Sequence, residues 1–541
     1  MTRRRAARGG AGIVAGAAFV IAALVVIPLA TLVGSLARPA TGTWRQLWDT
    51  ILPGALRDTL LLAMGVGVLS LLLGTALAVL VVFYDFPFRG IFEWALVLPL
   101  AVPGYVLTFV LVRQWDGSGP VSSALRQVFG DDGIRSVPGA IVVLSLVLYP
   151  YVYVLARSAF LGQSRSELEA AQSLGLSRFR AILRIALPTA RPTLAAGVAL
   201  AVMESVADFG TVNLLRVQTL TEAIYRTWYG EFDRRGAIQL ASLLLGAAAL
   251  LLLVEHLGRG RARFEQQLRR GTAGTPVRLT GARAWLATAA PAVVLTVVVL
   301  LPGAQLVVWA GRTLSRDGAD RYWSQAASSV LLAAAAAAIA CAAGLVLAYA
   351  QRMNAGGPAL RVAARVAGSG YALPGAVVAV AAITVYEWTD DRLLDIGRSL
   401  GWEPGLIFTG TALGLLLAYL MRFVSVALNT VDAHLTRIPT RLDEASAALG
   451  VTGVHALRRV HLPLLRPGLL AAALLVFVDV VKELPITALL RPLGWDTLAV
   501  GVWEATSDAR YDAAALPALT IVLVGIIPVV VLVRAARVNL H

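Results

Sequence analysis

ELEAAQSLGLSRFRAILRIALPTARP, at residues 167–192, has a second version in this chain, RLDEASAALGVTGVHALRRVHLPLLRP, at residues 441–467. Glu169 pairs with Glu444, which lies 275 positions later. The same spacing pairs Ala170 with Ala445, Leu174 with Leu449, Gly175 with Gly450, Arg184 with Arg459, Pro188 with Pro463, Arg191 with Arg466 and Pro192 with Pro467. Self-similarity at a fixed spacing indicates an internal repeat. The sequence therefore predicts two copies of one structural unit.

Each of these stretches has the pattern of a helix, a break and a second helix. Gly175 and Gly450 can adopt the left-handed conformation that ends a helix. Pro188 and Pro463 are expected to end the second helix, because proline disrupts a helix interior. Such a rigid element suits docking to a partner protein, and the alternative is an amphipathic helix at the membrane surface. Two copies at matched positions favour a two-fold partner.

The composition places the rest of the chain in a membrane. Of its 541 residues 58% are hydrophobic, and the mean hydropathy is +0.74, which exceeds what a soluble domain can bury. A bilayer core of about 30 Å requires about 20 apolar residues per helix. Such runs predict twelve spans, at 11–36, 57–83, 91–115, 139–160, 193–215, 237–257, 285–310, 324–350, 366–388, 407–431, 468–490 and 514–533.

The positive charge follows the membrane topology. The net charge of +15 would suit a nucleic-acid binder if the protein were soluble. However, the arginines lie between the apolar runs, for example in RRR at residues 3–5 and in the basic, glycine-rich stretch at 258–284. This placement is typical of cytoplasmic segments of membrane proteins. The charge therefore predicts contact with membrane lipid and argues against nucleic acid as a partner.

The spans divide the chain into two halves. Residues 1–257 form a first repeat with its loop at 164–192, and residues 285–541 form a second repeat with its loop at 437–467. Residues 258–284 form a cytoplasmic linker between them. Six spans per half place both termini in the cytoplasm and give the halves the same orientation. We therefore predict an all-α, polytopic membrane protein of two parallel six-helix repeats.

The pattern E-A-A-x-x-L-G, followed by L-P, resembles the EAA loop of permeases from binding-protein-dependent ABC importers. The first half has the pattern intact, and Ser446 replaces the second alanine in the second half. In that family the loop is a coupling helix that docks into a groove of the ATPase. The resemblance covers both halves, and it implies a type I importer permease fold in the bacterial inner membrane. It assigns ATPase coupling to Glu169, Ala170, Ala171, Gly175, Pro188, Glu444, Ala445, Gly450 and Pro463.

No sequence feature indicates that the chain hydrolyses ATP or is an enzyme. A phosphate-binding Walker A loop requires a lysine after a glycine-rich turn, and Lys482, the only lysine, lies in an apolar run. We assign no catalytic residue and expect no cofactor on this chain. The resemblance implies that ATP and Mg are used by a separate homodimeric ATPase, of which one fused chain engages two copies. It also implies a periplasmic or lipid-anchored solute-binding protein.

Ionisable residues in the fifth predicted span of each half are candidates for the translocation pathway. Glu204 and Asp208 pair with Asp479 and Glu483 at the spacing of 275, and Lys482 precedes Glu483. Ionisable groups inside a membrane are costly and are often functional. The i, i+4 spacing puts each carboxylate pair on one helix face, and oxygen ligands suit a hard cation.

The alternative is a structural role for these residues. Lys482 would neutralise a neighbouring carboxylate, while Gly210 and Pro485 would mark a broken helix whose freed backbone groups need polar partners. The metal ligands, if any, are left unassigned, because none of the five histidines has metal-ligand spacing: His256, His434, His455, His461 and His541.

The sequences of three segments narrow the resemblance to particular groups of permeases. MESVADFGTVNLL at 203–215, TEAIYRTWYGEFDRRGAIQLA at 221–241 and KELPITALLRPLGWDTLAVGVWEA at 482–505 are similar to fused iron(III) transport permeases, and less closely to thiamine, polyamine and sulfate permeases. Ferric iron is therefore the expected substrate, with thiamine, a polyamine or an oxyanion as alternatives. A different class, an ion-coupled secondary transporter, also commonly has twelve spans in two parallel halves.

Aromatic residues follow the fifth span of each half. Tyr225, Trp228 and Tyr229 lie on the expected outer side, and Trp503 matches Trp228 at the spacing of 275. An aromatic belt at the membrane interface is the favoured interpretation. Contact with the binding protein is the alternative.

Overall fold

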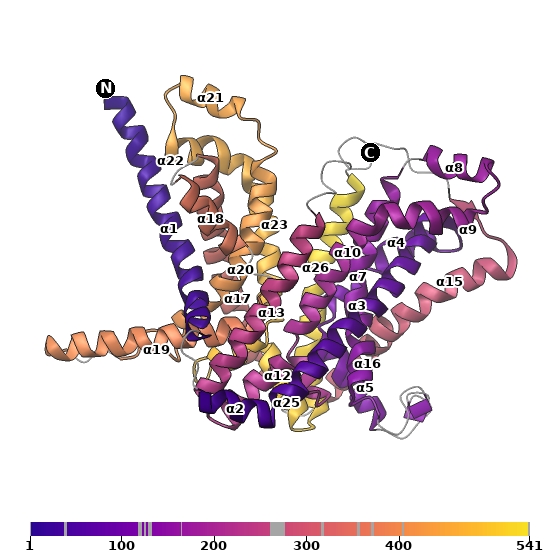
Figure 1. Cartoon of the computed structure of the whole chain (residues 1–541), viewed down its shortest axis with the longest axis horizontal. Coiled ribbons are helices and arrows are strands. Elements are labelled where there is room, and N and C mark those ends of the chain that lie inside the picture. Colours follow the sequence, from indigo (N-terminus) through magenta and orange to yellow (C-terminus); the bar gives the residue numbers. More distant parts are fainter. Residues whose placement is uncertain are drawn as a thin grey trace. The chain divides into compact units, whose positions relative to one another are not determined.

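A computed structural model describes residues 2–36, 41–116, 122–123, 126–127, 133–163, 165–259, 276–314, 319–353, 357–368, 370, 373–402 and 405–538. Most of these residues lie in helices (Figure 1). Within the described ranges the strands are limited to β1 (Tyr84–Asp85) and β2 (Val277–Arg278), which pair in parallel. The predicted all-α fold is confirmed.

The helices alternate between long apolar segments and short connecting elements. In the first half these are α1 (Thr2–Leu36), α2 (Thr41–Thr50), α3 (Leu52–Phe83), α4 (Arg89–Ala95), η1 (Leu98–Ala101), α5 (Gly104–Trp115), α7 (Val137–Leu161), α8 (Arg165–Ser173), α9 (Arg178–Ala181), η2 (Ile182–Ala186), α10 (Leu187–Ala207), α11 (Gly210–Leu214), α12 (Leu220–Tyr225), η3 (Arg226–Gly230) and α13 (Arg234–Arg259). In the second half they are α15 (Gly281–Leu295), η4 (Thr296–Leu300), α16 (Leu301–Leu314), α17 (Ala319–Arg352), α18 (Gly357–Gly368), α19 (Gly375–Ser399), α20 (Ala412–Leu435), α21 (Arg441–Ala448), α22 (Gly453–Ala456), η6 (Leu457–His461), α23 (Leu462–Val481), α24 (Pro485–Leu490), α25 (Leu498–Ser507) and α26 (Tyr511–Val538). Here η1 is a 3-10 turn, and the other η elements are π-helical turns.

Ten helices in the described residues are long and apolar enough to cross a membrane. An eleventh span is possible if Arg89–Ala101 and Gly104–Trp115, which are bent by 88° at their junction, count as one. Extended backbone at Pro103 separates the two pieces, because proline cannot continue the hydrogen-bond ladder. Eleven of the twelve predicted stretches therefore correspond to such a helix or bent pair.

The remaining predicted span, 366–388, is wrong as a single helix. It is divided between α18 and α19, and Pro374 is the extended N-cap residue of α19. The C-terminal part of α19 carries Glu387, Asp390, Asp391, Arg392, Asp395 and Arg398, so this helix is not apolar along its length. Figure 1 shows α19 extending beyond the other helices of its unit.

The chain forms two compact units that do not follow the sequence repeats. Unit 1 contains residues 1–46, 224–245 and 319–501, and unit 2 contains residues 47–223, 246–318 and 502–541. Each unit thus combines the central helices of one half with terminal helices of the other. In unit 1, for example, α1 packs against α17, α18 and α19. The division of the chain into repeats at 257 and 285 stays a prediction about the sequence.

Two glycines in similar segments, Gly74 in GTALA and Gly344 in GLVLA, lie 270 positions apart and bring two long helices together in each unit. A Cβ atom on Gly74 of α3 would lie 2.8 Å from the carbonyl oxygen of Tyr149 in α7. A Cβ atom on Gly344 of α17 would lie 2.8 Å from the backbone nitrogen of Leu428 in α20. Small residues permit such close backbone approach between membrane helices. The two glycines therefore fix equivalent helix pairs, and each pair leads into one of the repeated loops.

The predicted linker at 258–284 lies largely outside the described residues. Its described end contains β2 and the first turn of α15. The backbone N–H of Leu279 donates to the carbonyl oxygen of Asp85 at 2.8 Å, in addition to the β1–β2 pairing. The start of the second half is thus attached to the end of α3, within unit 2.

Candidate functional site

The repeated loops form equivalent pairs of short helices. In the first loop α8 is followed by Gly175 with a φ of 88° and then by α9. In the second loop α21 is followed by Gly450 with a φ of 79° and then by α22. The predicted pattern of helix, break and helix is confirmed.

The two breaks share one hydrogen-bond pattern. The backbone N–H of Leu176 donates to the carbonyl oxygen of Ala171 at 3.1 Å, and that of Gly175 donates to the carbonyl oxygen of Gln172 at 3.0 Å. The second break repeats both bonds 275 positions later, from Val451 to Ser446 at 2.8 Å and from Gly450 to Ala447 at 3.0 Å. This pair of bonds is the Schellman motif, which requires a left-handed residue and favours glycine. The local sequence therefore fixes the same turn twice.

Each turn presents a leucine to solvent. Leu174 is 86% exposed and Leu449 is 83% exposed, and each directly precedes the left-handed glycine. On both helices the glutamate and the first alanine of the motif, Glu169 with Ala170 and Glu444 with Ala445, are also exposed. By contrast Ala171 and its counterpart Ser446 are buried, so this position supports the loop from within. The arrangement is a protruding turn with an apolar tip and an acidic residue beside it, which is suited to docking in a groove.

The expectation that Pro188 and Pro463 end a helix is wrong. Each lies in the first turn of a long helix that continues directly from the π-helical turn before it, giving continuous helices over Arg178–Ala207 and Gly453–Val481. In an α-helix, a proline ring clashes with the carbonyl group four residues earlier. The π turn widens the helix at this point: Leu187 donates to the carbonyl oxygen of Ile182, five residues earlier. The loop is therefore joined rigidly to the fifth span.

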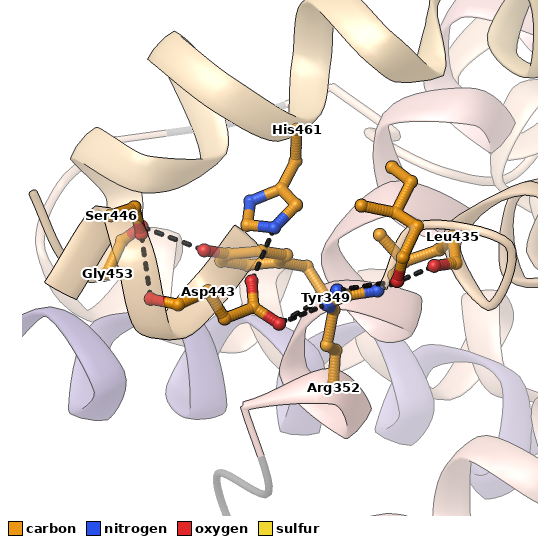
Figure 2. Close-up of polar contacts among 8 residues, drawn as sticks. Tyr349, Arg352, Leu435, Asp443, Ser446, Gly453 and His461 are labelled. Carbon is orange, nitrogen blue, oxygen red and sulfur yellow. Dashed lines mark hydrogen bonds and ion pairs between the residues drawn. The ribbon is translucent and has the colours of Figure 1, made fainter. Parts of the chain in front are cut away.

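The second loop is attached to the rest of unit 1 by a polar network (Figure 2). Arg352, the last residue of α17, donates from Nε and Nη2 to Oδ2 of Asp443 at 3.0 and 2.8 Å. His461, which is 1% exposed, lies with Nε2 at 2.6 Å from Oδ1 of the same carboxylate. The Tyr349 hydroxyl donates to the carbonyl oxygen of Gly453 at 2.9 Å, and its ring lies 5.4 Å from that of His461. No motif or spacing in the sequence indicated that these residues would meet.

The fifth span of each half is broken at equivalent positions. After α10 ends, Oδ1 of Asp208 accepts a hydrogen bond from the backbone N–H of Thr211 at 2.7 Å and so caps α11. After α23 ends, Oε1 of Glu483 accepts one from the backbone N–H of Ile486 at 3.0 Å and so caps α24. The two carboxylates therefore satisfy backbone groups that the breaks set free, as the structural alternative expected.

Ion pairs engage the charged residues of the second break. Oε2 of Glu483 lies 2.8 Å from Nη1 of Arg422, and both side chains are buried. Lys482 lies 2.8 Å from Asp479. Arg422 was not among the sequence candidates. A comparison of the two halves could have identified it, because the first half has an apolar residue, Val147, at the position 275 residues earlier.

The candidate pathway residues lie in both units. Glu204 and Asp208 belong to unit 2, whereas Asp479, Lys482 and Glu483 belong to unit 1. Within the described ranges, no group of three or more His, Cys, Asp and Glu side chains is placed to hold a metal ion. Their role in a translocation pathway stays a prediction.

Aromatic side chains brace the segments after the breaks. In unit 1 the Tyr229 hydroxyl donates to the carbonyl oxygen of Leu489 in α24 at 3.1 Å. In unit 2 the Trp503 indole N–H donates to Oδ1 of Asn213 in α11 at 3.0 Å, and its ring lies 5.9 Å from that of Phe209. These side chains thus have partners within the protein, which an interface belt does not require.

Comparison with known proteins shows a family match that covers most of the chain. The family described as "Binding-protein-dependent transport system inner membrane component" matches residues 70–316 and 340–539. The chain is 26% identical over 486 residues to the Fe(3+)-transport system permease protein FbpB 2 of Haemophilus influenzae, covering 89% of this chain and 90% of that protein. It is 28% identical over 238 residues to the sulfate transport system permease protein CysT of Salmonella typhimurium, covering 42% and 84%. It is 28% identical over 262 residues to a putative 2-aminoethylphosphonate transport system permease protein, PhnU, of Salmonella paratyphi A, covering 46% and 91%.

Proposed function

This chain belongs to the family of binding-protein-dependent transport system inner membrane components, and we propose that it forms the translocation pathway of an ABC importer for ferric iron. The observation that carries the proposal is the pair of matched loops. Each loop has an exposed leucine, Leu174 or Leu449, at the turn between its two short helices, and the two turns have the same hydrogen bonds. Exposed apolar surface rimmed by polar residues marks sites of protein interaction.

The partner of the loops is an ATPase with two-fold symmetry. Each loop docks on one ATPase subunit, so that one chain binds two copies. ATP and Mg are bound and used by these subunits. Closure of the ATPase dimer draws the loops together, and the long helices joined to them, Arg178–Ala207 and Gly453–Val481, reorient around the pathway.

The substrate reaches the pathway from outside, delivered by a periplasmic or lipid-anchored solute-binding protein. Both termini and the loops then lie in the cytoplasm, as the distribution of arginine indicates. Support for iron comes from the likeness to the Haemophilus influenzae protein along 89% of this chain, whereas the sulfate permease matches 42% of it. Glu483 forms a buried ion pair with Arg422, which supports a structural role for this carboxylate. We therefore expect iron to be recognised chiefly by the binding protein.

Aspartate at the loop tips tests the docking. The variants Leu174→Asp and Leu449→Asp are made singly and together, and the ATPase that co-purifies through an affinity tag on this chain is quantified. Burying a leucine is worth about 1.5–3 kcal/mol, so each variant is expected to weaken retention roughly 10- to 100-fold. Because both leucines are more than 80% exposed, the fold should be unaffected.

Leu493→Asp is the matched control, since Leu493 is fully exposed and lies outside both loops. It should leave retention unchanged. Unchanged retention and unchanged ATP-driven uptake in the double variant would contradict the proposed function. Uptake of radiolabelled ferric iron into proteoliposomes, competed with sulfate or 2-aminoethylphosphonate, tests the substrate separately.

A further inference from the structure

The two loops differ in how they are attached to the membrane helices. The second loop depends on three ionisable side chains, namely Arg352, Asp443 and His461. At the spacing of 275 the first half has Leu168 opposite Asp443 and Ala186 opposite His461. The spacing of 270 that matches Gly74 with Gly344 puts Val82 opposite Arg352. The first half therefore lacks all three groups.

The arginine of this network joins three elements. Besides its two bonds to Asp443, its guanidinium donates to the carbonyl oxygens of Leu435 at 2.5 Å and Ile438 at 3.0 Å, at and just after the end of α20. Arg352 is the last residue of α17, and its side chain is only 12% exposed. Charge-assisted bonds of this kind are among the stronger hydrogen bonds in proteins. A displacement of α21 must therefore move the ends of α17 and α20 or break these bonds.

The histidine joins a fourth element to the same carboxylate. His461 ends η6, and α23 follows without a break. The Tyr349 ring packs beside the imidazole, so α17 contributes a second residue to the cluster (Figure 2). Asp443 uses both of its oxygens, one for each side of the cluster. The carboxylate thus contacts both α17, through Arg352, and the turn η6 that leads into α23, through His461.

In the first loop a described contact has its charged donor on the loop and its acceptor on the membrane helix, the reverse of the second loop. Arg178 of α9 donates to the carbonyl oxygen of Phe83, the last residue of α3, at 3.1 Å. Here the loop supplies the cation and the membrane helix supplies a neutral backbone acceptor. The two halves therefore use different chemistry at equivalent places.

We propose that Asp443 is a positioning residue that makes α21 move as one body with the ends of α17, α20 and α23. On this view, which rests on the proposed function, the second loop transmits the motion of the ATPase to its unit through an ion-pair network whose three groups have no counterpart at the matched positions of the first half. The importer is then coupled unequally through its two loops.

The test uses the complex co-purified through a tag on this chain and reconstituted in proteoliposomes. Asp443→Asn keeps the shape of the side chain and removes its charge. It should leave ATPase retention unchanged but lower the radiolabelled ferric iron moved per ATP hydrolysed, by roughly 2- to 30-fold, which is the range for residues along a coupling network. Arg352→Gln combined with Asp443→Asn should show a defect smaller than the sum of the two single defects, because the two residues share one ion pair.

A second readout does not depend on the substrate. Hydrogen exchange of residues 441–448 and 345–352 is compared with and without Mg-ATP and vanadate. Both segments should respond in the natural protein, whereas in Asp443→Asn only 441–448 should respond. His461→Gln, which keeps an N–H donor toward Asp443, should retain the coupling that His461→Ala loses. Asp508→Asn, which removes an exposed ion pair with Arg510, is the control and should change nothing.

Two results would overturn the inference: an Asp443→Asn variant with normal transport per ATP and a normal response in 345–352, or one whose main defect is loss of the ATPase. If instead the leucine-tip variants keep the ATPase bound, the proposed function itself fails. The two failures are thus distinguishable.

Discussion

At the scale of single residues, equivalent carboxylates have the same task in different surroundings. Asp208 and Glu483 each cap the short helix after a broken span. Only Glu483 is paired with a buried arginine, Arg422, because Val147 stands at the matching place in the first half. The second carboxylate is therefore held as part of a neutralised pair.

Removal of this arginine gives the first prediction. In Arg422→Gln, Glu483 would remain buried without its counter-charge, and breaking a buried pair on one side costs about 3–5 kcal/mol. The thermal unfolding midpoint of the purified protein should fall clearly. Arg422→Gln combined with Glu483→Gln should recover much of the loss, since Gln keeps an acceptor for the Ile486 N–H.

Lys482→Gln is the control, because its pair with Asp479 is more exposed than that of Arg422 with Glu483. A smaller loss is expected. An Arg422→Gln variant as stable as the natural protein would show that the pair contributes little.

At the scale of elements, the loops depend on backbone conformation as much as on side chains. Gly175 and Gly450 have φ values of 88° and 79°, and nothing lies within 4 Å of a Cβ atom built on either. Substitution by alanine therefore meets no steric contact and only a backbone penalty, about 1–2 kcal/mol for a left-handed residue.

Gly175→Ala and Gly450→Ala are expected to loosen the turns. Hydrogen exchange of the N–H groups of Leu176 and Val451, which close the two turns, should accelerate, and ATPase retention should fall. Gly246→Ala in α13 is a matched control with equally open surroundings inside a helix, where alanine is favoured. Unchanged exchange at the turns would contradict the role assigned to the left-handed glycines.

A pH effect is expected at the end of α5. Asp116 pairs with Arg135 at 2.8 Å, and the hydrogen bonds from Arg135 lower the pKa of this carboxyl below its usual 3.8. Because the folded pKa is lowered, the stabilisation is present above the unfolded value and is lost as the pH falls through the folded one. This attachment should therefore persist at pH 5 and weaken only below about pH 4.

Asp116→Asn should abolish this dependence. The measurement is hydrogen exchange of residues 111–116 between pH 6 and pH 3, corrected for the intrinsic rate. Loss of protection already near pH 5 would contradict the lowered pKa.

The sequence predicted the helical class, the repeat and the turns, because these depend on residues close together in the chain. Gly175 and Pro188 were found by pattern, yet the role of Pro188 was misjudged, since the π turn before it depends on the continuity of a whole helix. Arg352, Asp443 and His461 were not connected, because they lie up to 109 positions apart and no periodicity links them. The prediction of a single span at 366–388 was wrong because the length and apolarity of a segment do not reveal a break such as the extended backbone at Pro374.

At the scale of the whole molecule, the terminal helices connect the halves. Unit 1 contains α1 together with α17 to α24, and unit 2 contains α15, α16 and α26 together with α3 to α11. Each half thus lacks part of its own unit when it is alone. Fusion into one chain supplies both parts in equal amounts.

Because each unit contains helices from both halves, we can predict how a chain cut into two pieces behaves. Residues 1–270 and 271–541, produced separately, should each be unstable in membranes and degraded, because α1 and α26 would have no unit to complete. Co-production of the two pieces should restore a complex that purifies through a tag on either one. Stable, separately folded halves would contradict the composition of the units.

In our proposal two matched turns lie in the cytoplasm and bind an ATPase, and thiol labelling can detect both properties. Leu174→Cys and Leu449→Cys are made in a Cys341→Ala background, which leaves a single cysteine per variant. With a membrane-impermeant maleimide, both positions should label in inside-out vesicles and not in right-side-out vesicles, and bound ATPase should protect both. Labelling from the outside, or labelling that the ATPase does not reduce at either position, would show that the turns do not bind an ATPase in the cytoplasm.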